Sequence, residues 1–144
     1  MIFLDANFLV YLNLSHEEVV DYYLRLLRSE ALFTDPLVLD EVIYVSKKKY
    51  GVKYCDTISF LDEIVLPYVT VLPVTVKDYE RAKEIMLKYS LKPSDAFHVA
   101  VMLNNSVLTI LSEDGEFDKV NAIRRVWLKG GPSFNGARRL SDLP

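Results

Sequence analysis

Four acidic side chains, spread along the chain, are the best candidates for chemistry in this sequence: Asp5, Glu41, Asp95 and Asp114. If these carboxylates converge, their mutual repulsion raises their pKa values unless a cation neutralises them. A site made only of oxygen ligands, without histidine or cysteine, selects a hard divalent cation such as Mg²⁺ or Mn²⁺. The residue types therefore predict a metal site built from four carboxylates.

Other common chemistries find little support in the sequence. Cys55 is the only cysteine, which excludes disulfide frameworks, and His16 and His98 are the only histidines. Gly51 and Gly115 are the only glycines before residue 130, so the phosphate-binding loops G-x-x-x-x-G-K and G-x-G-x-x-G are absent. We expect His98 to pack or cap rather than to bind a metal.

Short apolar runs alternate with longer amphipathic segments along the 144 residues. Strands are expected at 2–4, 31–33, 69–74, 107–111 and 123–128, and helices at 16–29, 36–50, 53–66, 77–89 and 95–103. This alternation predicts a three-layer α/β/α domain with a mainly parallel sheet of four to five strands. The length suits one domain over 1–144, with an irregular tail after about residue 129.

Several helix starts carry capping signals. Ser15 with Glu18 has the spacing of a capping box, in which a hydroxyl and an acid three residues later bond each other's backbone, and Thr75 with Asp78 is expected to cap the helix at 77–89. Asp35 precedes a proline, the pattern of an N-cap followed by the first helical residue. These signals predict where three of the helices begin.

The predicted elements bring the four acids together. Asp5 ends the first strand, and Asp114 follows strand 107–111, so both lie at the carboxyl edge of the sheet, where open α/β folds have their functional crevice. Asp95 lies in the first turn of a helix, and helix starts face the same edge. Glu41 falls on the apolar stripe of its helix, where a carboxylate needs a partner.

Four short motifs carry these acids: Leu4-Asp5-Ala6-Asn7, Leu39-Asp40-Glu41-Val42, Pro93-Ser94-Asp95-Ala96-Phe97 and Leu111-Ser112-Glu113-Asp114-Gly115-Glu116-Phe117. Their order and spacing resemble those of the PIN domain, the nuclease domain of VapC-type toxins, over nearly the whole chain. The resemblance implies a PIN-like fold and a ribonuclease that hydrolyses RNA phosphodiester bonds with Mg²⁺ or Mn²⁺.

The resemblance also implies roles for individual side chains. Asp5 and Asp95 would be direct metal ligands, while Glu41 and Asp114 would hold water ligands or a second ion. Ser112 stands where the family has Thr or Ser. Glu113 and Asp114 are adjacent acids where one is required, so the identity of the fourth ligand stays open.

Two further side chains are expected to support the acids. Asn7 is interpreted as a hydrogen-bond donor to the carboxylates, and Asp118 as an additional acid near the site. The net charge of −3 excludes a strongly basic nucleic-acid binder. It does not exclude a nuclease whose acids are neutralised by a bound cation.

The implied partners are RNA, a small antitoxin protein and a second copy of the chain in a homodimer. Tyr22, Tyr23, Phe60 and Leu61 give two helices more apolar surface than one buried stripe needs, which favours a partner face. No apolar stretch reaches the roughly 20 residues of a membrane span, and no signal peptide is recognised, so a cytoplasmic protein is expected.

Two other functions remain open. One is a haloacid-dehalogenase-like phosphohydrolase with Asp5 as nucleophile, although Asn7 stands where that class needs a second carboxylate. The other is a catalytically silent PIN-like module that binds RNA or protein. The four intact acids argue against the silent module.

Overall fold

Five short strands form one sheet in the computed structural model, which describes residues 1–128. They are β1 (Ile2–Leu4), β2 (Leu32–Thr34), β3 (Val69–Val71), β4 (Thr109–Leu111) and β5 (Arg124–Val126). The spatial order is β3-β2-β1-β4-β5, and every neighbouring pair is parallel. The predicted α/β class is confirmed, whereas the tail predicted after residue 129 lies outside the described residues.

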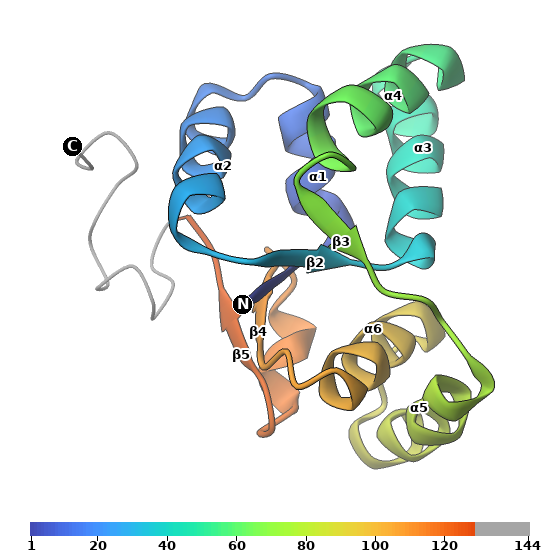
Figure 1. The fold of residues 1–144 in the computed structure, drawn as a ribbon. Coiled ribbons are helices and arrows are strands. Elements are labelled where there is room, and N and C mark those ends of the chain that lie inside the picture. Colours follow the sequence, from blue (N-terminus) through green and yellow to red (C-terminus); the bar gives the residue numbers. More distant parts are fainter. Residues whose placement is uncertain (129–144) are drawn as a thin grey trace.

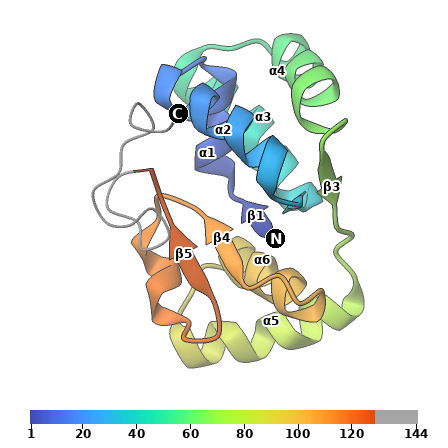
Figure 2. The same ribbon diagram turned by 60° about the vertical axis from the view of Figure 1, so that its left-hand side comes forward.

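Helices cover both faces of this sheet. They are α1 (Ala6–Asn13), α2 (Glu17–Ser29), α3 (Pro36–Tyr50), α4 (Tyr54–Phe60) with its π-helical continuation η1 (Leu61–Val65), α5 (Val76–Tyr89), α6 (Pro93–Asn104) and the 3₁₀-helix η2 (Gly115–Lys119). Figures 1 and 2 show α1 to α4 on one face and α5 and α6 on the other. The domain therefore has the predicted three layers.

The central strands are apolar because both of their faces are covered. Phe3 and Leu4 of β1 and Ile110 of β4 are fully buried, and Phe8 of α1 packs into the same core. Strands β3 and β4 are shorter than the predicted 69–74 and 107–111. The flanking residues Leu72 and Val107 are also buried, so an apolar pattern extends past the hydrogen-bonded ladder.

Helix α1 is absent from the sequence prediction. The segment after β1 has no clean amphipathic period, because Phe8, Leu9, Val10 and Leu12 are all buried. Asp5 caps this helix, since its Oδ1 accepts a hydrogen bond from the Ala6 backbone N–H at 2.8 Å. The first candidate acid is thus held at a strand-to-helix junction.

One of the two helix caps predicted for α2 and α5 is present. Thr75 and Asp78 form the reciprocal bonds at the start of α5. The box predicted for Ser15 and Glu18 is wrong, because Ser15 adopts a left-handed conformation with φ of 58° and α2 begins only at Glu17. The Ser15 backbone N–H bonds back to an α1 carbonyl, so this serine ends one helix instead of starting the next.

The predicted apolar partner face is mostly core. Tyr22, Tyr23 and Leu61 are at most 4% exposed, and of the four residues only Phe60 is half-buried. The two tyrosines pack against Phe8 across the layer. Among the described residues, no helix is both long and apolar enough to cross a membrane.

Candidate active site

The four predicted acids face one cavity of about 230 Å³ at the carboxyl edge of the sheet. Asp5 follows β1, Asp114 follows β4, Asp95 lies in the first turn of α6 and Glu41 lies on α3. All four line the cavity. Residues up to 109 positions apart in the sequence therefore meet because parallel strands end, and the helices after them begin, at this edge.

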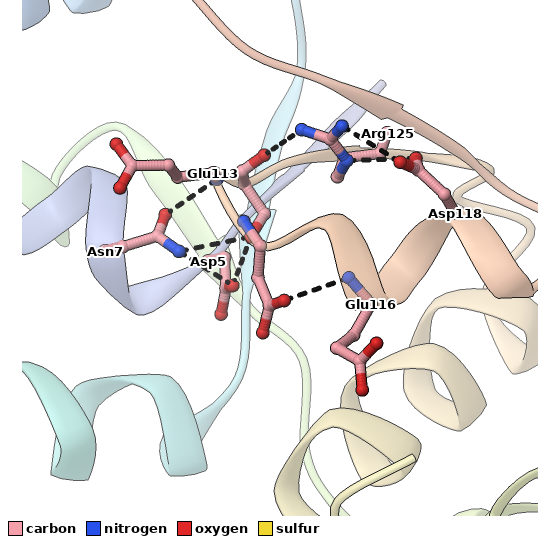
Figure 3. Close-up of polar contacts among 8 residues, drawn as sticks. Asp5, Asn7, Glu113, Glu116, Asp118 and Arg125 are labelled. Carbon is pink, nitrogen blue, oxygen red and sulfur yellow. Dashed lines mark hydrogen bonds and ion pairs between the residues drawn. The ribbon is translucent and has the colours of Figure 1, made fainter. Parts of the chain in front are cut away.

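Asp5 is the most firmly held of the acids. Its side chain is buried, and its Oδ2 accepts a 2.6 Å hydrogen bond from the Ser112 hydroxyl, while Oδ1 caps α1. Asn7 Nδ2 lies 3.5 Å from the same Oδ2. These three contacts hold the carboxylate in one orientation, and Figure 3 shows how Asn7 lies against Asp5.

Asn7 and Ser112 also tie the β1 edge to the loop after β4. Asn7 Nδ2 donates to Ser112 Oγ at 3.2 Å, and Asn7 Oδ1 accepts from the Glu113 backbone N–H at 3.2 Å. Ser112 Oγ accepts in turn from the Asp114 backbone N–H at 3.1 Å. The loop carrying Asp114 is thereby fixed relative to Asp5.

The adjacent acids Glu113 and Asp114 point to different places. Asp114 caps η2, where its Oδ1 accepts from the Glu116 backbone N–H at 2.9 Å, and it lines the acid cavity. Glu113 is exposed, accepts a hydrogen bond from the Tyr11 hydroxyl at 3.2 Å and does not line that cavity. The geometry separates the two acids and puts Asp114 with the other three.

Asp118 does not line the acid cavity. It forms a two-point ion pair with Arg125, with distances of 2.9 Å to Nε and 3.0 Å to Nη2. Arg125 Nη1 then donates to the Ser112 carbonyl at 3.1 Å, as Figure 3 shows. Asp118 therefore contacts the site only through Arg125, which itself braces the loop after β4.

Burial and the negative charges of neighbouring acids raise the pKa values of Asp95 and Glu41. Burial, followed by the negative charge of Asp5 and smaller contributions from Asp114 and Glu41, raises the pKa of Asp95 to about 6, although His98 offsets part of this effect. Glu41 is exposed on α3, and partial desolvation together with the charge of Asp5 raises the pKa of its carboxyl. The repulsion within the group is therefore incompletely neutralised by the protein.

This arrangement fits a hard cation in charge and ligand type. All four acids offer oxygen ligands, and a divalent ion would offset the repulsion that raises the pKa of Asp95. Within residues 1–128, however, no three His, Cys, Asp or Glu side chains already lie close enough together to enclose a metal. A bound ion would require the carboxylates to draw together or to contact it through water.

A buried ion pair beneath the acids was not predicted. His98 Nδ1 lies 2.7 Å from Asp35 Oδ2, and both side chains are at most 1% exposed. Asp35 also caps α3, accepting from the Val38 backbone N–H at 3.0 Å. His98 is packed, as expected, but the capping signal of Asp35 gave no hint of a partner 63 residues away.

The pair also acts on the site electrostatically. Burial alone would lower the pKa of His98, but the hydrogen bond and charge of Asp35, with the charges of Asp5 and Asp95, raise it. When protonated, the imidazole in turn lowers the pKa values of Glu41 and Asp95. Asp35 at the start of α3 and His98 in the middle of α6 join the helices that carry those two acids.

The parallel sheet with four acids at its carboxyl edge agrees with the PIN-like fold that the resemblance in the sequence implies. The PIN domain family model matches residues 2–123. Two relatives, the VapC ribonuclease of Mycobacterium bovis and ribonuclease VapC13 of Mycobacterium tuberculosis, are each 34% identical over 134 residues, covering 88% of this chain and 99% of theirs. The chain therefore belongs to the PIN domain family, and its relatives are VapC-type ribonucleases.

Solved structures share the fold. VapC20 of Mycobacterium tuberculosis, described as a toxin that cleaves the sarcin-ricin loop, matches with a TM-score of 0.66 and 22% identity over 82% of this chain and 93% of its own. A chain of VapBC2 from Rickettsia felis, bound to promoter DNA, matches with a TM-score of 0.70 and 19% identity over 88% and 98%. Membership of this family removes the support for a dehalogenase-like phosphohydrolase.

Proposed function

We propose that this PIN domain is a metal-dependent ribonuclease that hydrolyses RNA phosphodiester bonds and is the toxin of a toxin-antitoxin pair. The observation that carries the proposal is the convergence of Asp5, Glu41, Asp95 and Asp114 on one cavity. The relatives named VapC ribonuclease supply the substrate class, RNA.

The cofactor proposed is Mg²⁺ or Mn²⁺, held by Asp5 and Asp95, with Glu41 and Asp114 completing the site directly or through water. When bound, such an ion lowers the pKa of water and stabilises the charge that develops during phosphodiester hydrolysis. The protein itself holds the ligands in position. For example, the Ser112 hydroxyl orients the carboxylate of Asp5 through a hydrogen bond. Lys49 and Lys92 line the same cavity and are suited to contact the RNA phosphates.

The proposal is tested by incubating the purified protein with single-stranded RNA in Mg²⁺, in Mn²⁺ and in excess EDTA. We expect cleavage with either ion and none in EDTA, with activity restored when the ion is added back. A protein that binds RNA but does not cut it with either ion would instead be a silent PIN-like module.

Loss of the Ser112 hydroxyl is expected to lower the affinity for the metal ion without abolishing binding. Ser112→Ala frees Asp5 Oδ2 from its 2.6 Å hydrogen bond, and losing such a supporting contact typically costs about 10- to 100-fold in metal affinity or activity. Calorimetric titration with Mn²⁺ measures the affinity. Ser112→Thr, which keeps the hydroxyl, is the control and should bind within a few-fold of the original protein.

Metal binding is expected to weaken below about pH 6. The pKa of Asp95 is raised to about 6 in the metal-free protein, so this carboxylate takes up a proton as the pH falls through that value and then competes with the ion. Titrations with Mn²⁺ at pH 5.5, 6.5 and 7.5 should show rising affinity. An affinity that is flat over this range would contradict the assignment of Asp95 as a ligand.

The same proposal includes the partner proteins and the cellular location. We expect a small antitoxin to bind this protein, because one similar structure is a toxin-antitoxin complex from Klebsiella pneumoniae. We also expect the protein to form a homodimer and to act in the cytoplasm. We also expect 1–144 to form one domain. Size-exclusion chromatography with light scattering tests the dimer, and a monomer at micromolar concentration would count against it.

A further inference from the structure

A second cavity, of about 400 Å³, adjoins the acid cavity. Its aromatic wall consists of Tyr11, His16 and Trp127, and its acidic lining consists of Glu17, Glu18 and Glu113. Tyr11 lines both cavities, so the aromatic cavity lies beside the cavity of the four acids. A molecule bound at the acids has this cavity as its neighbour.

The aromatic side chains are ordered by packing. Tyr11 and His16 stack with their ring centroids 5.0 Å apart and an angle of 24° between the rings. Trp127 lies 6.1 Å from Tyr11 and meets the buried ring of Phe8 edge-on at 6.2 Å. The Tyr11 hydroxyl donates to Glu113, and burial together with that carboxylate raises the pKa of Tyr11, so the phenol stays neutral. The aromatic wall is therefore anchored on the core.

We propose that this aromatic cavity binds one base of the RNA, next to the phosphodiester bond that is cut at the acids. The inference rests on the proposed ribonuclease function and adds a specificity-determining site to it. Proteins recognise unpaired bases by stacking them on aromatic side chains, including tyrosine, tryptophan and histidine. Because Tyr11 lines both cavities, a base in the aromatic cavity and a phosphate at the four acids could belong to neighbouring nucleotides.

The carboxylates that line the cavity predict which bases fit. Glu17, Glu18 and Glu113 accept hydrogen bonds and cannot donate them when ionised, so they match bases with exocyclic amino groups. Uracil has no exocyclic amino group, and its one ring N–H lies between two carbonyl oxygens that repel a carboxylate, so uracil is disfavoured there. The RNA phosphates stay on the other side of Tyr11, where Lys49 and Lys92 offset the acids.

The test is cleavage of an RNA pool randomised around the cut, with the ends sequenced. We expect the original protein to disfavour uracil at one position next to the cut, and Trp127→Ala to flatten that bias. On the preferred RNA, Trp127→Ala should lower kcat/KM by about 5- to 150-fold, the range that corresponds to one base-stacking contact. Trp127→Phe keeps a ring and should retain most of the bias.

Two more variants separate folding from recognition. His16→Ala removes an exposed ring from the cavity and should also weaken the bias. Tyr79→Ala removes an exposed ring of α5 that lines neither cavity, and should leave the bias and rate unchanged.

The outcomes distinguish this inference from the proposed function. If the original protein does not cut RNA, the proposed function fails and the base site falls with it. If it cuts RNA without a base bias, or if Trp127→Ala and His16→Ala keep that bias, the inference is overturned and the ribonuclease assignment stands. The inference is equally overturned if Trp127→Ala and His16→Ala leave RNA cleavage unchanged but weaken binding of a basic partner protein to this acidic cavity.

Discussion

Replacing Asp95 with asparagine is expected to lower RNA cleavage by more than about 100-fold, beyond the loss typical of a residue that only supports a metal ligand. Asparagine keeps the shape of the side chain but removes the negative charge that attracts the cation. Asp95 lies in the cavity with the other three acids. Initial rates on single-stranded RNA in Mg²⁺ measure the effect.

The same substitution should stabilise the metal-free protein. The pKa of Asp95 rises to about 6 on folding, from an unfolded value near 4, so the folded state binds the proton more tightly and loses stability as the pH rises from about 4 to 6. Asparagine carries no such penalty. Because Asp95 is partly exposed and screened by solvent, we expect a gain of about 1–2 kcal/mol at pH 7.5.

The control for both measurements is Asp40→Asn. Asp40 is an exposed acid next to Glu41 on α3, and it does not line the cavity. We expect this variant to keep full activity and to change the free energy of unfolding by less than about 0.5 kcal/mol. Urea unfolding in EDTA compares the proteins. An Asp95→Asn variant that cleaves RNA normally, or that loses stability without metal, would contradict the role assigned to Asp95.

Removing His98 should have the largest effect on stability. His98→Ala leaves Asp35 as a buried carboxylate without its partner at 2.7 Å, and breaking a buried ion pair in this way costs about 3–5 kcal/mol. The ring also packs against Phe3, with centroids 5.6 Å apart, so a cavity adds to the cost. Urea or thermal unfolding measures the change.

His16→Ala is the matched histidine control for stability. His16 is exposed and precedes α2, so we expect its loss to cost less than about 1 kcal/mol. A double-mutant cycle of Asp35→Asn and His98→Ala should give a strong coupling energy. If His98→Ala costs no more than His16→Ala, the pair does not carry the stability that its burial indicates.

Much of the fold could be predicted because the local patterns agree with it. Asp35-Pro36 and Thr75 begin α3 and α5, and the apolar run at 2–4 is the central strand. Helix α1 could not be predicted, because burial on most sides erases its amphipathic period. Ser15 fails as a capping residue since its conformation is set by the end of the preceding helix.

The site divides in the same way. The four acids could be proposed from residue type, because strand ends and helix starts in a parallel sheet share an edge. Asn7 could also be expected beside the carboxylates from its place in the Leu4-Asp5-Ala6-Asn7 motif, whereas other polar contacts join segments that no local pattern links. Asp118 reaches Arg125 and not the cavity, and Asp35 meets His98 from a distant helix. The sequence favoured Asp114 but left open whether Glu113 shares the site, and the turn into η2 separates the two acids.

The most direct test of the four-carboxylate metal site is a titration with Mn²⁺ followed by calorimetry at pH 7.5. The original protein and Asp40→Asn should bind the ion with the same affinity, and Asp5→Asn should lose binding by more than about 100-fold, because Asp5 is the acid that Ser112, Asn7 and the start of α1 hold in place. Equal binding by the original protein and Asp5→Asn would contradict the account.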